Sequence, residues 1–297
     1  MRASEAIPTY YDLPALKASL YGWKVSAYMF VAGLAGSAQI IAAAADLIDP
    51  DGNRGTVRHG RYVAAAGAAL GAPLLILDLR TPQRFFNMLR IFRLTSPMSI
   101  GTYALTGFGG LSGLLAAGQL LHDRGIAPAA IARASKYVEV PAAILGMGMS
   151  TYTGALLTAT STPLWAAAPR LIPAAFGASA MASAAGLLSL AARNGAGDTL
   201  RRIERIASVA DLAALAALSK GLRREGIRTR SDAVPAKIAA AAPLLAPLAV
   251  RLGIRRAPAA AAAASILGGF LLRHLLLRAG NRSAERPRDY FRFARPR

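Results

Sequence analysis

The residues best suited to chemistry begin in the stretch Leu75–Gly101, which joins two long apolar segments and is called the connector below. Asp78 stands where the first of these segments ends. Four arginines interleaved with phenylalanines follow it: Arg80, Arg84, Arg90 and Arg93. Arginine and aromatic side chains are well solvated together at a membrane surface. We expect the connector to lie on such a surface, with Asp78 either carrying protons or pairing with Arg80 or Arg84.

Carboxylates also occur within the apolar segments. Asp211 lies near the middle of the segment Ile203–Leu218, and Glu139 stands at the opening of another. An ionisable residue inside a membrane is costly and therefore usually functional, so Asp211 is a candidate proton-route residue. Glu139 is a weaker candidate, because a helix N-terminus stabilises a carboxylate without any further role. Asp46, at the end of the first segment, is expected to be exposed.

Composition assigns the sequence to the membrane proteins. Its 297 residues are 54% hydrophobic and 17% charged, with a mean hydropathy of +0.38, which is too apolar for a soluble domain of this length. The net charge of +20 also suits a nucleic-acid-binding protein, but the arginines mark the edges of apolar segments rather than one face of a soluble domain. Anionic lipid headgroups or an acidic partner protein fit this pattern better.

Two further features of the sequence limit its chemistry and processing. There is no cysteine, so the protein itself holds no disulfide, iron–sulfur cluster or thiolate metal site. The first 24 residues include Glu5 and Asp12 and lack a short apolar core. They are therefore not expected to be a cleaved signal peptide.

Hydropathy predicts an all-α integral membrane protein with about eight transmembrane helices in a bundle. The apolar segments are Val25–Ile48, Tyr62–Leu79, Ile100–Leu121, Val138–Thr160, Leu164–Ala192, Ile203–Leu218, Ile238–Leu252 and Pro258–Leu277. About 20 residues are needed to cross the hydrocarbon core, so the sixth and seventh segments require neighbouring helices to be stable there. The expected organisation is an N-terminal surface segment (1–24), a transmembrane domain (25–279) and a basic C-terminal tail (280–297).

An even number of helices places both termini on one side of the membrane. That side carries more lysine and arginine than the other, mostly in the connector, in the loop after the sixth segment and in the tail. Positively charged loops are retained in the cytoplasm. The termini are therefore expected to be cytoplasmic.

Four stretches resemble a known family, the NrfD/PsrC membrane subunits of polysulfide-reductase-like and formate-dehydrogenase-like complexes. The first is Tyr10–Lys17 (YYDLPALK), which continues into Tyr21–Gly36. The second is the connector, with DLRTPQRF, NMLR and SPMSIG. The third is Tyr152–Leu157 (YTGALL), continued by Pro163-Leu164-Trp165, and the fourth is Phe176–Gly186. Their order and spacing carry the resemblance over roughly residues 10–190.

The resemblance implies an eight-helix subunit without haem that exchanges electrons and protons with a membrane quinone, such as menaquinone. It also implies a docked iron–sulfur subunit of the four-cluster ferredoxin type, which would connect the quinone to a molybdopterin-type catalytic subunit. The histidines of the sequence also indicate that haem b is absent, because haem b needs paired histidines inside the bundle. His59 and His122 lie in or beside loops, and only His274 lies within a segment. No metal is expected in this protein.

Successive helices cross the membrane in opposite directions, which brings the three strongest motifs to the terminal side of the membrane. Trp23, Tyr28 and Tyr152 can supply aromatic walls and hydrogen-bond donors for a quinone, and Lys24 can supply a charged donor. The resemblance implies a quinone contact for Tyr152. Trp23 and Lys24 are equally explained as interfacial anchors. The connector arginines Arg80, Arg84, Arg90 and Arg93 are expected to contact lipid or the partner subunit.

Two other hypotheses stay open. The family pattern has an aspartate near Ala159, a histidine near Ala166, and an acid or histidine where Lys24 stands. A protein without those groups is alternatively a membrane anchor for the iron–sulfur subunit with impaired or lost quinone chemistry. A transporter is the third hypothesis, because Pro243 and Pro247 are typical of a broken helix, although the sequence shows no internal repeat.

Overall fold

A computed structural model describes residues 16–78, 82–90, 92–93, 95–126, 129–192, 195–227, 234–286 and 289. Within these residues the protein forms eight long helices and no strand, which confirms the predicted all-α fold. The long helices are α1 (Trp23–Ile48), α2 (Arg54–Ile76), α4 (Pro97–Asp123), α5 (Ala129–Thr158), α7 (Leu171–Ala191), α8 (Ala196–Arg224), α9 (Val234–Arg251) and α10 (Ala257–Ala284).

Three short elements join the long helices. The connector contains the 3₁₀ helix η1 (Pro82–Arg84) and the helix α3 (Phe85–Arg90), and α6 (Pro163–Ala166) lies between α5 and α7. Ser96 caps α4 by accepting a hydrogen bond from the backbone amide of Ser99 at 3.4 Å. Pro97 occupies the first turn, where a missing amide hydrogen costs nothing. The serine and proline of the connector therefore fix where α4 begins.

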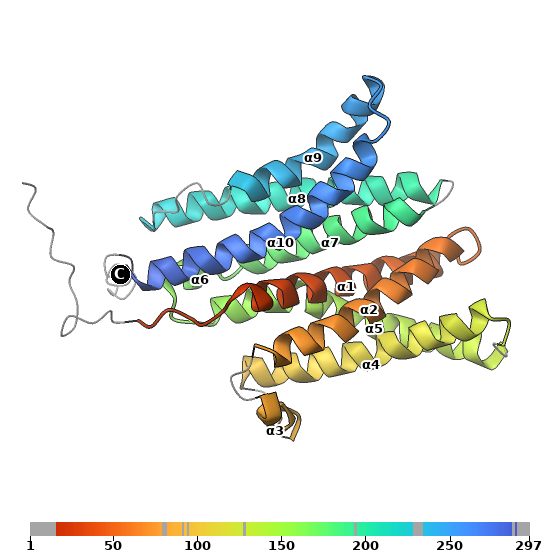
Figure 1. Cartoon of the computed structure of the whole chain (residues 1–297), viewed down its shortest axis with the longest axis horizontal. Helices are drawn as coiled ribbons and strands as arrows, with labels where there is room; N and C mark the ends of the chain where they lie inside the picture. The colour runs from red at the N-terminus through yellow and green to blue at the C-terminus, as the bar shows by residue number, and fades with distance from the viewer. Residues whose placement is uncertain are drawn as a thin grey trace, which may run out of the picture.

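The helices form two groups of four that lie side by side (Figure 1). One group contains α1, α2, α4 and α5, and the other contains α7, α8, α9 and α10. Contacts of α1 with α7 and α10, and of α5 with α7, join the two groups. The start of α1, the connector and the end of α10 lie at one end of the molecule, called the terminal face here. The loops α1–α2, α4–α5, α7–α8 and α9–α10 lie at the opposite face.

Five of the helices are long and apolar enough to cross a membrane. They are α1, α4, residues Arg133–Thr158 of α5, α7 and α10. The other three long helices, α2, α8 and α9, pack against them. Segment Tyr62–Leu79 was expected to be an apolar span, but α2 begins eight residues earlier at Arg54 and carries Arg58 and Arg61 in its first turns. The protein is a multi-pass membrane protein.

Small residues allow a close helix contact in the first group. Gly36 of α1 meets Gly146 of α5, and a Cβ atom at position 146 would lie 2.6 Å from the carbonyl oxygen of Gly36. Backbones approach this closely only where both helices lack side chains. A glycine pair thus sets the distance between α1 and α5, the two helices that carry Tyr28 and Tyr152.

Candidate functional site

Two tyrosines from different helices converge near the terminal face. Tyr28 of α1 is buried, and its ring faces Gly71 of α2, where a Cβ atom would lie 3.7 Å away. Tyr152 of α5 donates its hydroxyl hydrogen to the carbonyl oxygen of Pro97 at the start of α4. Helices α1 and α5 are in contact close to the two tyrosines, where the Ser150 hydroxyl donates to the carbonyl oxygen of Gly33 at 3.4 Å. Three helices and the connector therefore place two tyrosines near the terminal face, and these two residues are called the aromatic cluster below.

Lys24 ties the start of α1 to the end of α2. Its Nζ donates a hydrogen bond to the carbonyl oxygen of Leu77 at 3.3 Å, the residue before Asp78. Asp78 is half-buried, and its backbone amide donates to the carbonyl of Leu75 at 3.2 Å. Trp23 is 61% exposed and lies outside the aromatic cluster, as expected of an interfacial anchor. The structure thus places Lys24 and Asp78 at the end of α2, on the face where the tyrosines converge.

A second aromatic pair extends the cluster toward the other helix group. Tyr21 stacks on Trp165 of α6, with ring centroids 6.4 Å apart. Trp165 is buried and donates its Nε1 hydrogen to the carbonyl oxygen of Leu276 at 3.1 Å. The sequence motif containing Trp165 carries part of the family resemblance, but its pairing with Tyr21 was not anticipated.

The connector presents a basic and apolar surface. Arg90 and Arg93 are exposed, and so are Phe86 (74%) and Phe92 (52%). Arg84 ends η1, and Arg80 lies outside the described residues. The backbone is held by Tyr103 of α4, whose hydroxyl donates to the carbonyl of Leu89 at 2.7 Å. A surface of this kind suits a headgroup layer or a partner protein.

A buried arginine joins the two helix groups. Arg273 of α10 is fully buried. Its guanidinium donates hydrogen bonds to four acceptors: the carbonyls of Met29 (3.1 Å), Gly269 (2.7 Å) and Phe176 (2.9 Å), and the hydroxyl of Ser179 (3.1 Å). It also lies over the Phe176 ring, 4.7 Å from its centroid. A guanidinium does not lose its proton, so Arg273 is a buried cation held by carbonyl and hydroxyl oxygens and by the face of the Phe176 ring.

Asp211 of α8 is a second buried ionisable residue of this helix group, and no ion pair joins it to Arg273 among the described residues. Its carboxyl group is buried, and its Oδ1 has no hydrogen-bond partner among the described residues. Glu204 lies two turns earlier on the same helix. It is also buried and accepts a hydrogen bond from Ser265 of α10 at 2.7 Å. Asp211 was selected from the sequence, but Glu204 and the role of Arg273 were missed, although each is an ionisable residue within an apolar segment.

A further buried ionic network lies in the first helix group, near the opposite face. Arg61 of α2 donates two hydrogen bonds to Oε2 of Glu139 of α5, at 3.0 and 2.6 Å. Gln39 of α1 donates to Oε1 of Glu139 at 3.0 Å, and Gln119 of α4 accepts from Arg61 at 3.0 Å. Arg61 also lies 3.5 Å from Asp46.

This network corrects two expectations from the sequence. Helix α5 begins at Ala129 rather than near Val138, so Glu139 lies well inside the helix and is not stabilised by its N-terminus. It is buried because Arg61 and Gln39 satisfy its carboxylate. Asp46 was expected to be exposed, but its side chain is only 16% exposed because it faces Arg61.

Within the described residues, no three His, Cys, Asp or Glu side chains gather as metal ligands. His274 interacts instead with Ser26, at 3.3 Å from Nδ1 to Oγ, and stacks on Phe270.

The fold and these sites define a multi-pass helical membrane protein with ionisable groups buried in both helix groups. The family described as polysulphide reductase, NrfD, matches residues 14–229. The protein belongs to the NrfD family, which confirms the resemblance seen in its motifs. It is also 30% identical over 154 residues to the C subunit of polysulfide reductase from Wolinella succinogenes, and the match covers 47% of this protein and 48% of that subunit. The match thus spans about half the length of this relative.

Proposed function

We propose that this protein is the quinone-reactive membrane subunit of a multi-subunit oxidoreductase in the bacterial inner membrane. The observation that carries the proposal is that Tyr28, against Gly71 at the end of α2, and Tyr152, against the start of α4, both lie near the terminal face and next to the connector. Family membership supports it, because the matched relative is a subunit of a polysulfide reductase. The excess of basic residues on the terminal side favours cytoplasmic termini.

Different residues at this site contribute different functions to quinone chemistry. Interconversion of a quinone and its quinol, such as menaquinol, moves two electrons and two protons. Tyr28, Tyr152 and the half-buried Tyr21 offer flat apolar surface for the ring. Lys24 offers a hydrogen-bond donor for one of its oxygens, and the Tyr152 hydroxyl can serve the other oxygen once it leaves the Pro97 carbonyl. Asp78 offers a carboxylate that accepts protons. Asp211, buried on α8, continues the proton route into the second helix group.

The electrons require a partner, since the sequence has no cysteine with which to hold an iron–sulfur cluster. We assign this role to a docked iron–sulfur subunit of the four-cluster ferredoxin type. Arg90 and Arg93 on the exposed connector suit an acidic docking surface. A molybdopterin-type catalytic subunit would exchange electrons with that iron–sulfur subunit.

A second candidate function is a membrane anchor that holds the iron–sulfur subunit without reacting with quinone. It is favoured by Ala159 and Ala166, which stand near the terminal face where the family pattern has an aspartate and a histidine. An anchor needs the docking surface but not the tyrosine hydroxyls. The two functions therefore differ in their dependence on Tyr152.

The experiment is purification of the complex from membranes, followed by analysis of bound menaquinone and of quinol-dependent reduction of the iron–sulfur subunit. Tyr152→Phe is expected to abolish that reduction while the subunits stay assembled. Tyr137→Phe is the matched control, because Tyr137 lies on the same helix and is 78% exposed. Absence of both menaquinone and quinol-dependent reduction in the unmodified complex would refute the quinone assignment. Partner loss on deletion of this subunit, with Tyr152→Phe fully active, would establish the anchor.

A further inference from the structure

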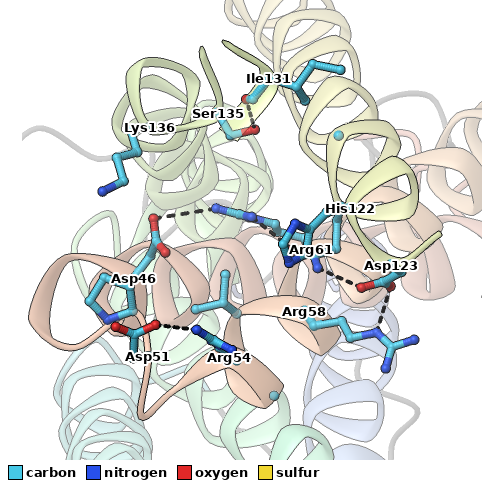
Figure 2. Close-up of a pocket in the computed structure, with 15 residues that line it drawn as sticks. Asp46, Asp51, Arg54, Arg58, Arg61, His122, Asp123, Ile131, Ser135 and Lys136 are labelled. Carbon is cyan, nitrogen blue, oxygen red and sulfur yellow. Dashed lines mark hydrogen bonds and ion pairs between the residues drawn. The ribbon is translucent and has the colours of Figure 1, made fainter. Parts of the chain in front are cut away.

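The opposite face of the first helix group contains a pocket of about 540 Å³. It lies between the end of α1, the start of α2, the end of α4 and the start of α5. Several charged and polar side chains line it, including Asp46, Arg58, Arg61, Gln119 and Asp123. Figure 2 shows Arg61 reaching toward Asp46 and Arg58 paired with Asp123. The aromatic cluster of Tyr28 and Tyr152 lies toward the other end of the same helices.

Glu139 lies behind this lining. Its side chain is 1% exposed, and the two residues that separate it from the pocket, Arg61 and Gln119, are hydrogen-bonded to each other. The same guanidinium nitrogen, Nη2 of Arg61, is 2.6 Å from Oε2 of Glu139 and 3.5 Å from Oδ2 of Asp46. One arginine thus stands between a carboxylate that lines the pocket and one that is buried.

Charge counting distinguishes this cluster from a simple ion pair. Arg58 is matched by Asp123 at 2.8 Å, and Arg54 is matched by Asp51 at 2.6 Å. Arg61 instead faces two carboxylates, Asp46 and Glu139. The other titratable groups in the lining are His122 and Lys136, and Tyr62 donates its hydroxyl hydrogen to Asp123 at 2.7 Å. Lys136 brings the lining together with Glu139 to four cations and four carboxylates, but it takes part in none of the ion pairs among the described residues. Asp46 and Glu139 therefore share one guanidinium, and two carboxylates in this arrangement favour the binding of one proton between them.

On the buried side of Glu139, further polar groups lie along α1 and α5 in the direction of the tyrosines. Gln39 is fully buried, donates to Glu139, and has no partner for its Oε1 among the described residues. Farther along the α1–α5 interface, the hydroxyl oxygens of Ser37 and Ser150 lie 3.0 Å apart. Tyr152 follows Ser150 on α5. Polar groups therefore occur on both sides of the Gly36–Gly146 contact.

We propose that Asp46, Arg61 and Glu139 form a proton-exchange site that communicates with the aqueous phase on the face opposite to Tyr152. A proton enters from water in the pocket to the Asp46 carboxylate and passes to the Glu139 carboxylate, which leaves Asp46 ionised and ready to accept another. Arg61 stays protonated and holds both carboxylates in place. The exchange itself is independent of quinone, and only its coupling to electron transfer rests on the proposed function.

Access is tested first, on the full-length protein in membrane vesicles. The sequence has no cysteine, so single-cysteine variants have no background. Ser135→Cys, in the pocket lining, is expected to react with a membrane-impermeant thiol reagent from one side only. Asn87→Cys, exposed on α3, is expected to react from the other side only. Labelling of both positions from the same side would overturn the assignment of the pocket to the opposite face.

Proton binding is tested next by infrared difference spectroscopy on the protein in nanodiscs. Titration is expected to show a protonated-carboxyl band that shifts in D₂O and disappears in Glu139→Gln. Asp51→Asn, which removes an exposed carboxylate at the pocket rim, is the control that keeps the band. If no pH at which the protein is folded yields a band sensitive to Glu139→Gln, Glu139 is a permanently ionised structural partner of Arg61 and the proposal fails.

Coupling is measured in the assembled complex in oriented proteoliposomes with a pH-sensitive dye on the pocket side. Quinol-driven turnover is expected to change the pH on that side, and Glu139→Gln is expected to abolish the change. An unaltered pH change in Glu139→Gln would overturn the coupling. If the unmodified complex shows no quinol-driven turnover, the proposed function fails, whereas the labelling and infrared results still decide the proton-exchange site.

Discussion

Gly101 of α4 faces the phenol ring of Tyr152 so closely that a Cβ atom at position 101 would overlap the ring. One turn earlier, the carbonyl oxygen of Pro97 accepts the Tyr152 hydroxyl hydrogen. The start of α4 therefore fixes both the ring plane and the hydroxyl direction of Tyr152. Gly101 ends the connector, so the connector contributes to the aromatic cluster through its backbone as well as through its charged residues.

Gly101→Ala is predicted to displace the Tyr152 ring and lower quinol-dependent reduction of the iron–sulfur subunit. A displacement of about 1 Å in a positioned group can cost on the order of 10²-fold in rate. The subunits are expected to stay assembled, because Gly101 does not lie on the exposed surface of the connector. The measurement is the rate of quinol-dependent reduction in the purified complex, normalised to the amount of bound subunit.

Gly113→Ala is the control for this prediction. Gly113 lies on the same helix, and a Cβ atom there would meet no heavy atom within 4 Å. It should retain full activity. Equal rates for Gly101→Ala and the unmodified protein would show that the position of the Tyr152 ring does not matter for electron transfer.

Reversal of charge on the connector is predicted to release the partner subunit. Arg90→Glu combined with Arg93→Glu replaces two exposed cations by anions, which would repel an acidic docking surface. The protein itself should fold normally because neither side chain is buried. Co-purification of the iron–sulfur subunit with the tagged protein measures the effect, and raised salt should weaken the native complex in the same direction.

Arg54→Glu is the matched control for docking. Arg54 is also exposed, but it lies at the start of α2 on the opposite face, where it pairs with Asp51. Retention of the partner by the Arg90/Arg93 double variant would assign the basic connector to lipid headgroups instead.

The order of the helices was predictable because a helix must be long and apolar to be stable in membrane hydrocarbon. An apolar segment of about 20 residues can be recognised directly in the sequence. Eight segments were expected, and eight long helices are present among the residues that the structure describes. The helix ends were less predictable. Arg58 and Arg61 look like loop residues by hydropathy, yet they lie within α2 because carboxylates from α1, α4 and α5 neutralise or approach them.

The candidate sites were predictable only where one residue type was sufficient to mark them. Asp211 stands out as a carboxylate within an apolar segment. The pairing of Arg61 with Glu139 spans 78 residues, and that of Arg273 with the Met29 carbonyl spans 244. Such pairings depend on which helix faces pack together, and no local pattern encodes that. The sequence feature that could have revealed these pairings is the presence of charged residues within apolar segments, because each buried charge requires a partner.

Asp211 and Arg273 are predicted to be energetically coupled. No ion pair joins them among the described residues, but a carboxylate and a guanidinium buried in the same helix group attract each other through low-dielectric surroundings. Arg273→Met and Asp211→Leu should therefore each destabilise the protein, and the double variant should be less destabilised than the sum of the two. A double-mutant cycle on unfolding in mixed micelles is expected to give a coupling of about 0.5–3 kcal/mol. Strict additivity would mean that the hydrogen bonds of Arg273 to carbonyls and Ser179 stabilise it without Asp211.

The Gly36–Gly146 contact gives a prediction about packing in which two effects oppose each other. An alanine is intrinsically better than glycine within a helix by roughly 0.5–1 kcal/mol, but a Cβ atom at position 146 would lie 2.6 Å from the Gly36 carbonyl oxygen. Overpacking of this kind costs about 1–3 kcal/mol, so Gly146→Ala should be destabilising. Gly148→Ala, two residues along the same helix, has no neighbour within 4 Å and should be neutral or stabilising. Midpoints of unfolding in a denaturing detergent titration compare the two variants, and a stabilised Gly146→Ala would show that α1 and α5 can separate without cost.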